Sequence, residues 1–193
     1  MPDQTEILAI FKSSEALLEG HFQLTSGKHS PHYFQCAKVL QYPAHAETLC
    51  RMIADRFRPQ KVDVVIAPAL GGIIVGQEVG RQLQARTIFA ERKEAALELR
   101  RGFAVRPGER VLVCEDVVTT GGSVEEVLRI VRANGGEVVG VGAIVDRSGG
   151  RSGLPNLFAA MTMEVVLFNP EECPLCRRGV PVEKPGSKKT QPS

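Results

Sequence analysis

The residues with the clearest chemical potential lie between positions 111 and 123. Four apolar residues lead to two adjacent acids, Glu115 and Asp116, and a turn rich in glycines and hydroxyl groups follows them. Such a turn can hold a phosphate in backbone N–H groups and hydroxyls, and the N-terminus of the next helix favours the dianion. The acids would repel a phosphate, so we expect them to accept hydrogen bonds from the vicinal hydroxyls of a sugar attached to it. The pattern predicts a ribose 5-phosphate site made of Glu115, Asp116, Val117, Val118, Thr119, Thr120, Gly121, Gly122 and Ser123.

Positioning these groups requires a buried strand that ends at the acids and a helix that begins after the turn and ends at 134–136. Further helices are expected at 5–18, 43–57 and 73–84, and further strands at 62–67, 87–90, 138–145 and 164–168, with strands and turns over 22–41. Apolar strands that alternate with amphipathic helices predict an α/β fold. We expect a doubly wound, mostly parallel sheet flanked by helices, with binding groups at the C-terminal ends of its strands.

The composition of the chain indicates which classes of protein it can belong to. The chain has 193 residues, 43% hydrophobic and 24% charged, which is typical of one globular domain with a small appendage. A net charge of +2 gives no reason to expect nucleic-acid or membrane binding. The most apolar run, 64–76, is interrupted by a proline and glycines and is too short to cross a bilayer. Five cysteines and no secretory signal predict free thiols in the cytoplasm.

The turn is neither a Walker loop nor a dinucleotide fingerprint, because Gly-Lys-Ser/Thr and Gly-x-Gly-x-x-Gly are missing. Residues 111–123 resemble the phosphoribosyl pyrophosphate (PRPP) motif of type I phosphoribosyltransferases at every position. Over nearly its whole length the chain resembles the orotate phosphoribosyltransferases. The similar segments are a hood at 24–34, a pyrophosphate loop at 68–72, a mobile catalytic loop within 91–103, Asp146-Arg147, and a tail at 173–187.

This resemblance implies transfer of ribose 5-phosphate from PRPP to orotate, giving orotidine 5′-phosphate and pyrophosphate in de novo pyrimidine synthesis. The motif and Gly71, Arg92 and Lys93 would bind PRPP, and Glu115, Asp116, Arg92, Arg100 and Arg101 would be catalytic. Thr119, Arg147, Tyr33 and Phe34 would contact orotate, with the guanidinium matching its carboxylate bidentately. The resemblance also implies Mg²⁺, held mainly by PRPP rather than by side chains. It further implies a homodimer in which the 92–102 loop of one chain serves the partner's active site.

Departures from the family pattern keep alternatives open. Cations that many members carry are replaced here at Thr25, Gly71, Ala96 and Glu98. The sequence therefore leaves open which loop cation does their work, and Arg100 and Arg101 are the candidates. The alternatives are a phosphoribosyltransferase that uses a purine base and a PRPP-binding regulator without catalysis.

Three parts are expected: a helix and hood at 1–42, a core at 43–170, and a tail at 171–193 whose last residues are disordered. Cys173 and Cys176 supply only half of a four-coordinate zinc site, and no His or Cys follows them. A structural turn, a reducible pair, or a site shared across a dimer axis would each account for them. The four histidines lack metal-ligand company in the sequence and are assigned no chemistry; they are His21, His29, His32 and His45.

Overall fold

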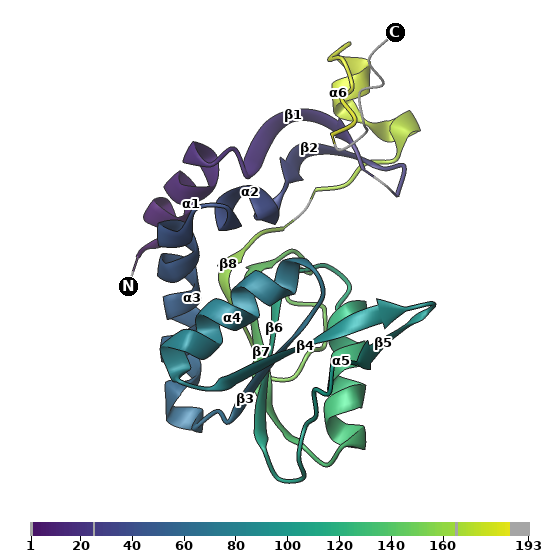
Figure 1. The fold of residues 1–193 in the computed structure, drawn as a ribbon. Helices are drawn as coiled ribbons and strands as arrows, with labels where there is room; N and C mark the ends of the chain where they lie inside the picture. The colour runs from purple at the N-terminus through teal and green to yellow at the C-terminus, as the bar shows by residue number, and fades with distance from the viewer. Residues whose placement is uncertain (1, 25, 165, 186–193) are drawn as a thin grey trace, which may run out of the picture.

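The computed structural model describes residues 2–24, 26–164 and 166–185. Thr25 and the end of the tail lie outside the described residues, so the predicted disorder of the last residues is not addressed by the structure. Figure 1 shows the arrangement of the helices and strands.

A six-stranded sheet forms the centre of the molecule, in the order β5-β4-β3-β6-β7-β8. Its strands are β3 (Val64–Pro68), β4 (Arg86–Lys93), β5 (Ala96–Leu99), β6 (Arg110–Val118), β7 (Glu137–Asp146) and β8 (Leu157–Thr162). β5 runs antiparallel to β4, and all other neighbouring pairs are parallel. Because parallel strands need crossover connections, helices follow β3 and β6 and cover the sheet.

Helices lie on both faces of this sheet. α3 (Pro43–Phe57) and α4 (Gly71–Leu83) cover one face, and α5 (Gly122–Ala133) covers the other. Successive residues of β3 alternate between the two cores: Val65 packs with the α3 and α4 side, while Val64 and Ile66 pack with α5. The predicted doubly wound, mostly parallel fold is confirmed.

A second, smaller unit stands at one end of the sheet. β1 (Leu17–Gln23) and β2 (His29–Phe34) form an antiparallel pair, called here the hood hairpin. The C-terminal tail (166–185), with η2 (Pro170–Glu172) and α6 (Pro174–Arg177), lies beside it (Figure 1). The Gln23 N–H donates to the Glu183 carbonyl at 2.8 Å, and the backbones of His29 and Phe168 exchange two hydrogen bonds. Two segments that are far apart in the sequence are therefore joined through their backbones. The remaining elements are α1 (Gln4–Ser13), α2 (Cys36–Leu40) and η1 (Arg58–Gln60).

Three predicted elements are wrong. The first helix ends at Ser13, because Glu15 takes a positive φ of 53° and the chain then enters β1, with Gly20 inside the strand rather than ending the helix. The last strand covers 157–162 instead of 164–168, since pairing with β7 outweighs the weak strand propensity of its two alanines. The charged segment after position 90 is not a plain loop: β4 continues to Lys93 and turns into β5.

Within the ranges that the structure describes, no helix combines the length and the apolar character needed to cross a bilayer.

Candidate active site

The main cavity has a volume of about 980 Å³ and lies between the hood hairpin, the C-terminal ends of β6 and β7, and the tail. Its walls include five of the residues predicted from the sequence: Tyr33, Phe34, Thr119, Thr120 and Arg147. Leu24 and Ser26 of the expected hood and Lys184 and Pro185 of the expected tail also line the cavity. The lining residues that the sequence analysis did not single out are Gln23, Ser148, Arg151, Ser152 and Leu167. A cavity of this size fits a ligand of sugar-phosphate and heterocycle dimensions.

The two acids predicted to bind ribose, Glu115 and Asp116, lie near the C-terminal end of β6, four and three residues before Thr119 of the cavity wall. Glu115 is buried, and its Oε1 accepts from the Asp116 N–H at 3.0 Å. Asp116 is half-buried, and its Oδ1 accepts from the Val117 N–H at 2.8 Å. Burial, with the neighbouring charge of Asp116, raises the pKa of Glu115 to about 8. Glu115 is thus protonated at neutral pH, and Asp116 carries the charge that a ligand would meet.

The start of α4 packs directly on these carboxylates. A Cβ at Gly71 would collide with the Asp116 Oδ2, and a Cβ at Gly72 would lie 3.0 Å from the Glu115 Oε1. In this structure Gly71 therefore lies in close approach to the Asp116 carboxylate. The structure thus brings the segment predicted to be the pyrophosphate loop against the two acids.

The turn after β6 leads into α5 as expected. Gly121 is the N-cap of α5 with a φ of 85°, a conformation that residues with a Cβ rarely adopt. Thr119 and Thr120 are exposed before it, and Ser123 is exposed in the first turn of the helix. Backbone N–H groups of a first helical turn have no partner within the helix, so they are available to an anion.

Arg147 follows the last residue of β7, and its backbone N–H donates to the Val118 carbonyl at 2.8 Å. This bond brings the Arg147 backbone beside the end of β6. Burial lowers the pKa of Arg147 from its ordinary value, and none of the ion pairs among the described residues includes this side chain. The next residue, Ser148, has a buried hydroxyl that lacks a hydrogen-bond partner among the described residues. A half-buried cation without a carboxylate, beside an unsatisfied hydroxyl, favours an anionic ligand.

The basic residues predicted to act on pyrophosphate do not line the cavity of their own chain. They lie on or beside the β4–β5 pair, residues 91–102, called here the basic hairpin. Arg92 pairs with Glu126 of α5 at 2.8 Å, and Arg101 pairs with Glu91 at 2.8 Å. Leu97 is buried, and its backbone N–H also donates to Glu126. The segment expected to be a mobile loop is thus a hairpin that is hydrogen-bonded and ion-paired to its own chain in this structure.

Sequence and structure comparisons agree with this geometry. Residues 37–156 match the family model of the phosphoribosyl transferase domain. The chain is 55% identical over 190 residues, 98% of both chains, to an orotate phosphoribosyltransferase of Chlorobium phaeobacteroides. It belongs to the orotate phosphoribosyltransferase family.

Solved structures support the fold of this family member. An orotate phosphoribosyltransferase from Aeropyrum pernix has a TM-score of 0.70 at 22% identity, over 81% of this chain and 93% of that one. An adenine phosphoribosyltransferase from Rhodothermus marinus has a TM-score of 0.65 at 23% identity, over 81% of this chain and 99% of that one. The same fold therefore carries enzymes named for different bases, so the acceptor must be inferred from the site itself.

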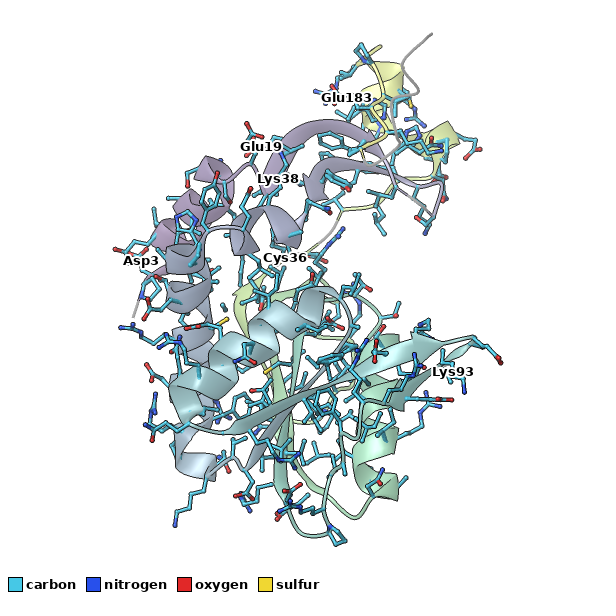
Figure 2. The ribbon with its side chains drawn as sticks, viewed as in Figure 1. Asp3, Glu19, Cys36, Lys38, Lys93 and Glu183 are labelled. Carbon is cyan, nitrogen blue, oxygen red and sulfur yellow. The ribbon has the colours of Figure 1, made fainter. Side chains whose placement is uncertain are left out.

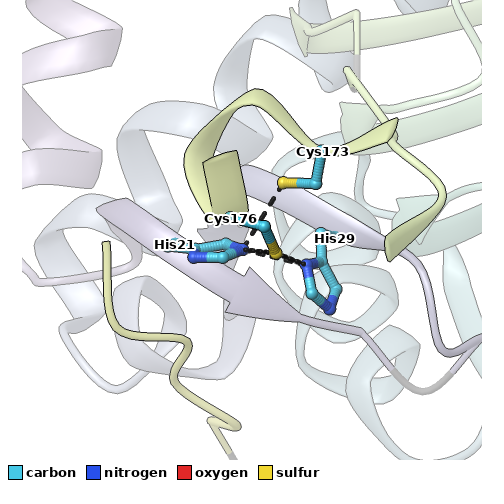
Figure 3. Close-up of side chains that lie close together, drawn as sticks. All are labelled: His21, His29, Cys173 and Cys176. Atoms are coloured by element: carbon cyan, nitrogen blue, oxygen red, sulfur yellow. Dashed lines mark hydrogen bonds between the residues drawn. The ribbon is translucent and has the colours of Figure 1, made fainter. Parts of the chain in front are cut away.

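Away from the cavity, the structure of this orotate phosphoribosyltransferase family member brings together His21, His29, Cys173 and Cys176 (Figure 3). The prediction that none of the histidines has metal-ligand company is wrong for His21 and His29. The two histidines supply the further ligands that the Cys-x-x-Cys sequence lacked. They precede the cysteines by more than 140 residues; Cys176 and His29, for example, are 147 positions apart. No local pattern in the sequence could have revealed this proximity.

The pKa of Glu115 leads to a prediction for stability. The folded state holds this proton up to about pH 8, whereas an unfolded glutamic acid loses it near its ordinary pKa of 4.5. Between these values the folded state binds one more proton, so stability falls as the pH rises, by at most about 1.4 kcal/mol per pH unit. Glu115→Gln keeps an oxygen that can accept from the Asp116 N–H, but it has no carboxyl proton to lose. The stability of this variant should therefore not fall as the pH rises over this range. Urea unfolding of both proteins at pH 5 and pH 8 measures it, with the exposed Glu125→Gln as control; parallel profiles for parent and Glu115→Gln would contradict the assignment.

Proposed function

We propose that the protein transfers the ribose 5-phosphate unit of PRPP to orotate, forming orotidine 5′-phosphate and pyrophosphate. The observation that carries the proposal is Arg147: a half-buried guanidinium in the cavity wall without a carboxylate partner among the described residues. Orotate offers a planar carboxylate that a guanidinium can bind with two parallel hydrogen bonds. The names of the family's curated members support the same reaction.

In this proposal the bond between ribose C1 and pyrophosphate breaks, and a bond from C1 to the orotate ring nitrogen forms as that nitrogen gives up its proton to solvent or to the departing pyrophosphate. The turn 119–123 and the start of α5 bind the 5′-phosphate, while Glu115 and Asp116 face the ribose hydroxyls. Asp116 stabilises the positive charge that develops on the ribose ring. Tyr33 and Phe34 close the cavity over the acceptor ring and exclude water, which would otherwise hydrolyse PRPP. Catalysis then consists of positioning and charge stabilisation, and no protein nucleophile is needed.

The cofactor that we expect is Mg²⁺. Each carboxylate already accepts a backbone N–H, and Glu115 holds a proton at neutral pH. This donor set fits a metal that arrives on PRPP better than a metal held by protein side chains, with Asp116 as the charged group facing it. The ion would neutralise charge on the pyrophosphate as it leaves.

The experiment that tests the reaction is orotate-dependent release of pyrophosphate from PRPP and Mg²⁺, followed by identification of the nucleotide product. Adenine, guanine and hypoxanthine are supplied in parallel. Product with orotate alone supports the proposal. Product with a purine alone would instead support a purine phosphoribosyltransferase. PRPP binding without product from any base would support a PRPP-binding regulator. We also propose that the protein carries out this reaction in the cytoplasm, the location expected from its free cysteines.

We further propose that the protein acts as a homodimer in which the basic hairpin of one chain serves the active site of its partner. The hairpin stands out at the edge of the sheet, with Lys93 near its far end (Figures 1 and 2). Its cations do not line the cavity of their own chain. In a dimer these cations could reach the pyrophosphate that leaves in the partner's site. The hairpin would then not have to fold back across β3 and β4 of its own chain.

Mixing two inactive variants tests this arrangement. One is Asp116→Asn, and the other replaces Arg92, Lys93, Arg100 and Arg101 by Ala. If the hairpins act in trans, each heterodimer has one site with both parts intact, about half of its sites. A second loop variant, Lys93→Ala with Arg100→Ala, preserves the pairs of Arg92 and Arg101 and so keeps the hairpin anchored. Mixtures that stay inactive after demonstrated subunit exchange would rule out the trans arrangement.

A further inference from the structure

Four potential metal ligands converge between the hood hairpin and the tail (Figure 3). His21 lies on β1 and His29 on β2. Cys173 is the N-cap of α6, and Cys176 lies within this helix. Their ligand atoms all lie within 4.8 Å of one another. This cluster does not include any residue of the active-site cavity, so it is separate from the site described above.

Three nitrogen–sulfur distances between ligand atoms are close to the edges of a tetrahedron around zinc, and the two histidine nitrogens lie closer together than such an edge. Zinc bonds of about 2.3 Å to sulfur and 2.0–2.1 Å to nitrogen place neighbouring N and S ligands roughly 3.6 Å apart, and two N ligands roughly 3.3 Å apart. The His21 Nε2 lies 3.5 Å from the Cys173 Sγ and 3.7 Å from the Cys176 Sγ. The His29 Nδ1 lies 3.3 Å from the Cys176 Sγ and 2.9 Å from the His21 Nε2.

The orientation of the His21 ring also suits a metal ligand. Its Nδ1 lies 2.8 Å from the Val180 carbonyl, to which only a protonated Nδ1 can donate. The proton of a neutral ring is then on Nδ1, and the Nε2 lone pair faces the cluster. A backbone carbonyl that fixes the tautomer in this way is a common partner of metal-bound histidine.

Burial and ligand chemistry restrict the identity of the metal. His21, His29 and Cys173 are buried, whereas Cys176 is exposed and leaves a route for entry. Two sulfurs and two imidazoles in a tetrahedral arrangement favour Zn²⁺ and disfavour Mg²⁺, which prefers oxygen ligands. With four protein ligands the site has no open position, so its role is structural rather than catalytic.

We propose that His21, His29, Cys173 and Cys176 bind one Zn²⁺ within a single chain. This proposal replaces the half-site, reducible-pair and dimer-axis interpretations of the Cys-x-x-Cys sequence. A bound zinc would also hold the tail against the hood hairpin. Among the described tail residues only Cys173 and Leu175 are buried, which is too little apolar surface to fix a segment of this length.

The zinc would stabilise one wall of the cavity. The hood hairpin supplies Tyr33 to the cavity wall, and the tail supplies Leu167 and Lys184. The metal joins the two segments where the Glu183 N–H donates to the His21 carbonyl at 2.7 Å. Removal of the metal should release the tail and leave the sheet intact.

Metal content per chain tests the proposal directly. The full-length protein, purified without chelators, is loaded with Zn²⁺ and desalted, and its zinc is measured by mass spectrometry. We expect about one zinc per chain for the parent. Cys173→Ser and Cys176→Ser should lose it. The matched controls Cys50→Ala, a buried thiol of α3, and His32→Ala, a histidine of β2 outside the cluster, should keep it.

Cobalt gives a second readout, and its measurement on the parent does not depend on how well a variant folds. Co²⁺ bound to the parent should show the strong visible bands of a tetrahedral site and a thiolate charge-transfer band. Cys176→Ser, at an exposed position, should weaken the charge-transfer band. An octahedral spectrum, equal zinc in the cysteine variants and the controls, or no zinc in the loaded parent would each overturn the proposal. One zinc per two chains would favour a site shared between subunits instead.

Limited trypsin digestion reports the structural role. Arg177 and Arg178 lie at and just after the end of α6, so cleavage there follows opening of the tail. Chelation of zinc should speed this cleavage on the order of tenfold or more while the core stays intact. Equal cleavage rates with and without chelator would contradict a role in holding the tail. Since none of these measurements uses orotate or PRPP, their outcome is independent of the proposed reaction.

Discussion

Asp116→Asn should fold as the parent does and turn over orotate about a hundred times more slowly, the scale for loss of one preorganised electrostatic group. The carboxylate of Asp116 supplies the negative charge beside the ribose, since Glu115 holds a proton at neutral pH. An asparagine keeps an oxygen for the Val117 N–H and also keeps the size that Gly71 accommodates. The substitution therefore removes the charge and retains the packing.

The measurement is turnover at saturating orotate and PRPP, together with urea unfolding. Asp63→Asn is the matched control, because the Asp63 carboxylate also accepts a backbone N–H, that of Arg110 at 2.8 Å, but stands just before β3, at the opposite end of the strands. It should retain the parent's turnover. If Asp116→Asn turned over at the parent's rate, the acids would have no part in the reaction.

Arg147→Ala should raise the Michaelis constant for orotate about 30- to 150-fold and that for PRPP much less. A charge-assisted bidentate contact to a small ligand contributes roughly 2–3 kcal/mol, which corresponds to this range. The cavity wall offers no acid that pairs with Arg147 among the described residues, so its removal leaves no unpaired partner behind. The fold should therefore be unaffected.

Arg147→Lys separates charge from geometry. A lysine restores the charge but not the planar fork, so we expect a Michaelis constant for orotate between those of the parent and Arg147→Ala. Arg129→Ala, on the exposed side of α5, should change neither constant. Equal weakening of orotate and PRPP by Arg147→Ala would show that this residue does not bind the acceptor carboxylate.

The sequence by itself determined the parts of this protein whose cause is local. Residues 111–123 predict the strand, the turn and the start of α5 correctly, because a continuous apolar run, a glycine-rich turn and helical spacing all act within a few positions. The same holds for α3, which begins at Pro43 and buries one stripe of residues. The placement of Arg147 directly after β7 follows from the same local pattern.

Tertiary structure decided what depends on partners distant in the chain. β8 forms at 157–162 because β7 offers it a parallel edge, and the basic hairpin lies against α5 because Glu126 pairs with Arg92 and accepts from the Leu97 N–H. The cavity gains its tail residues only when the tail pairs with the hood hairpin. The cluster of His21, His29, Cys173 and Cys176 shows most clearly what cannot be predicted from local sequence. Its two halves are more than 140 residues apart, and only the closure of the chain brings four ligand atoms to within 4.8 Å.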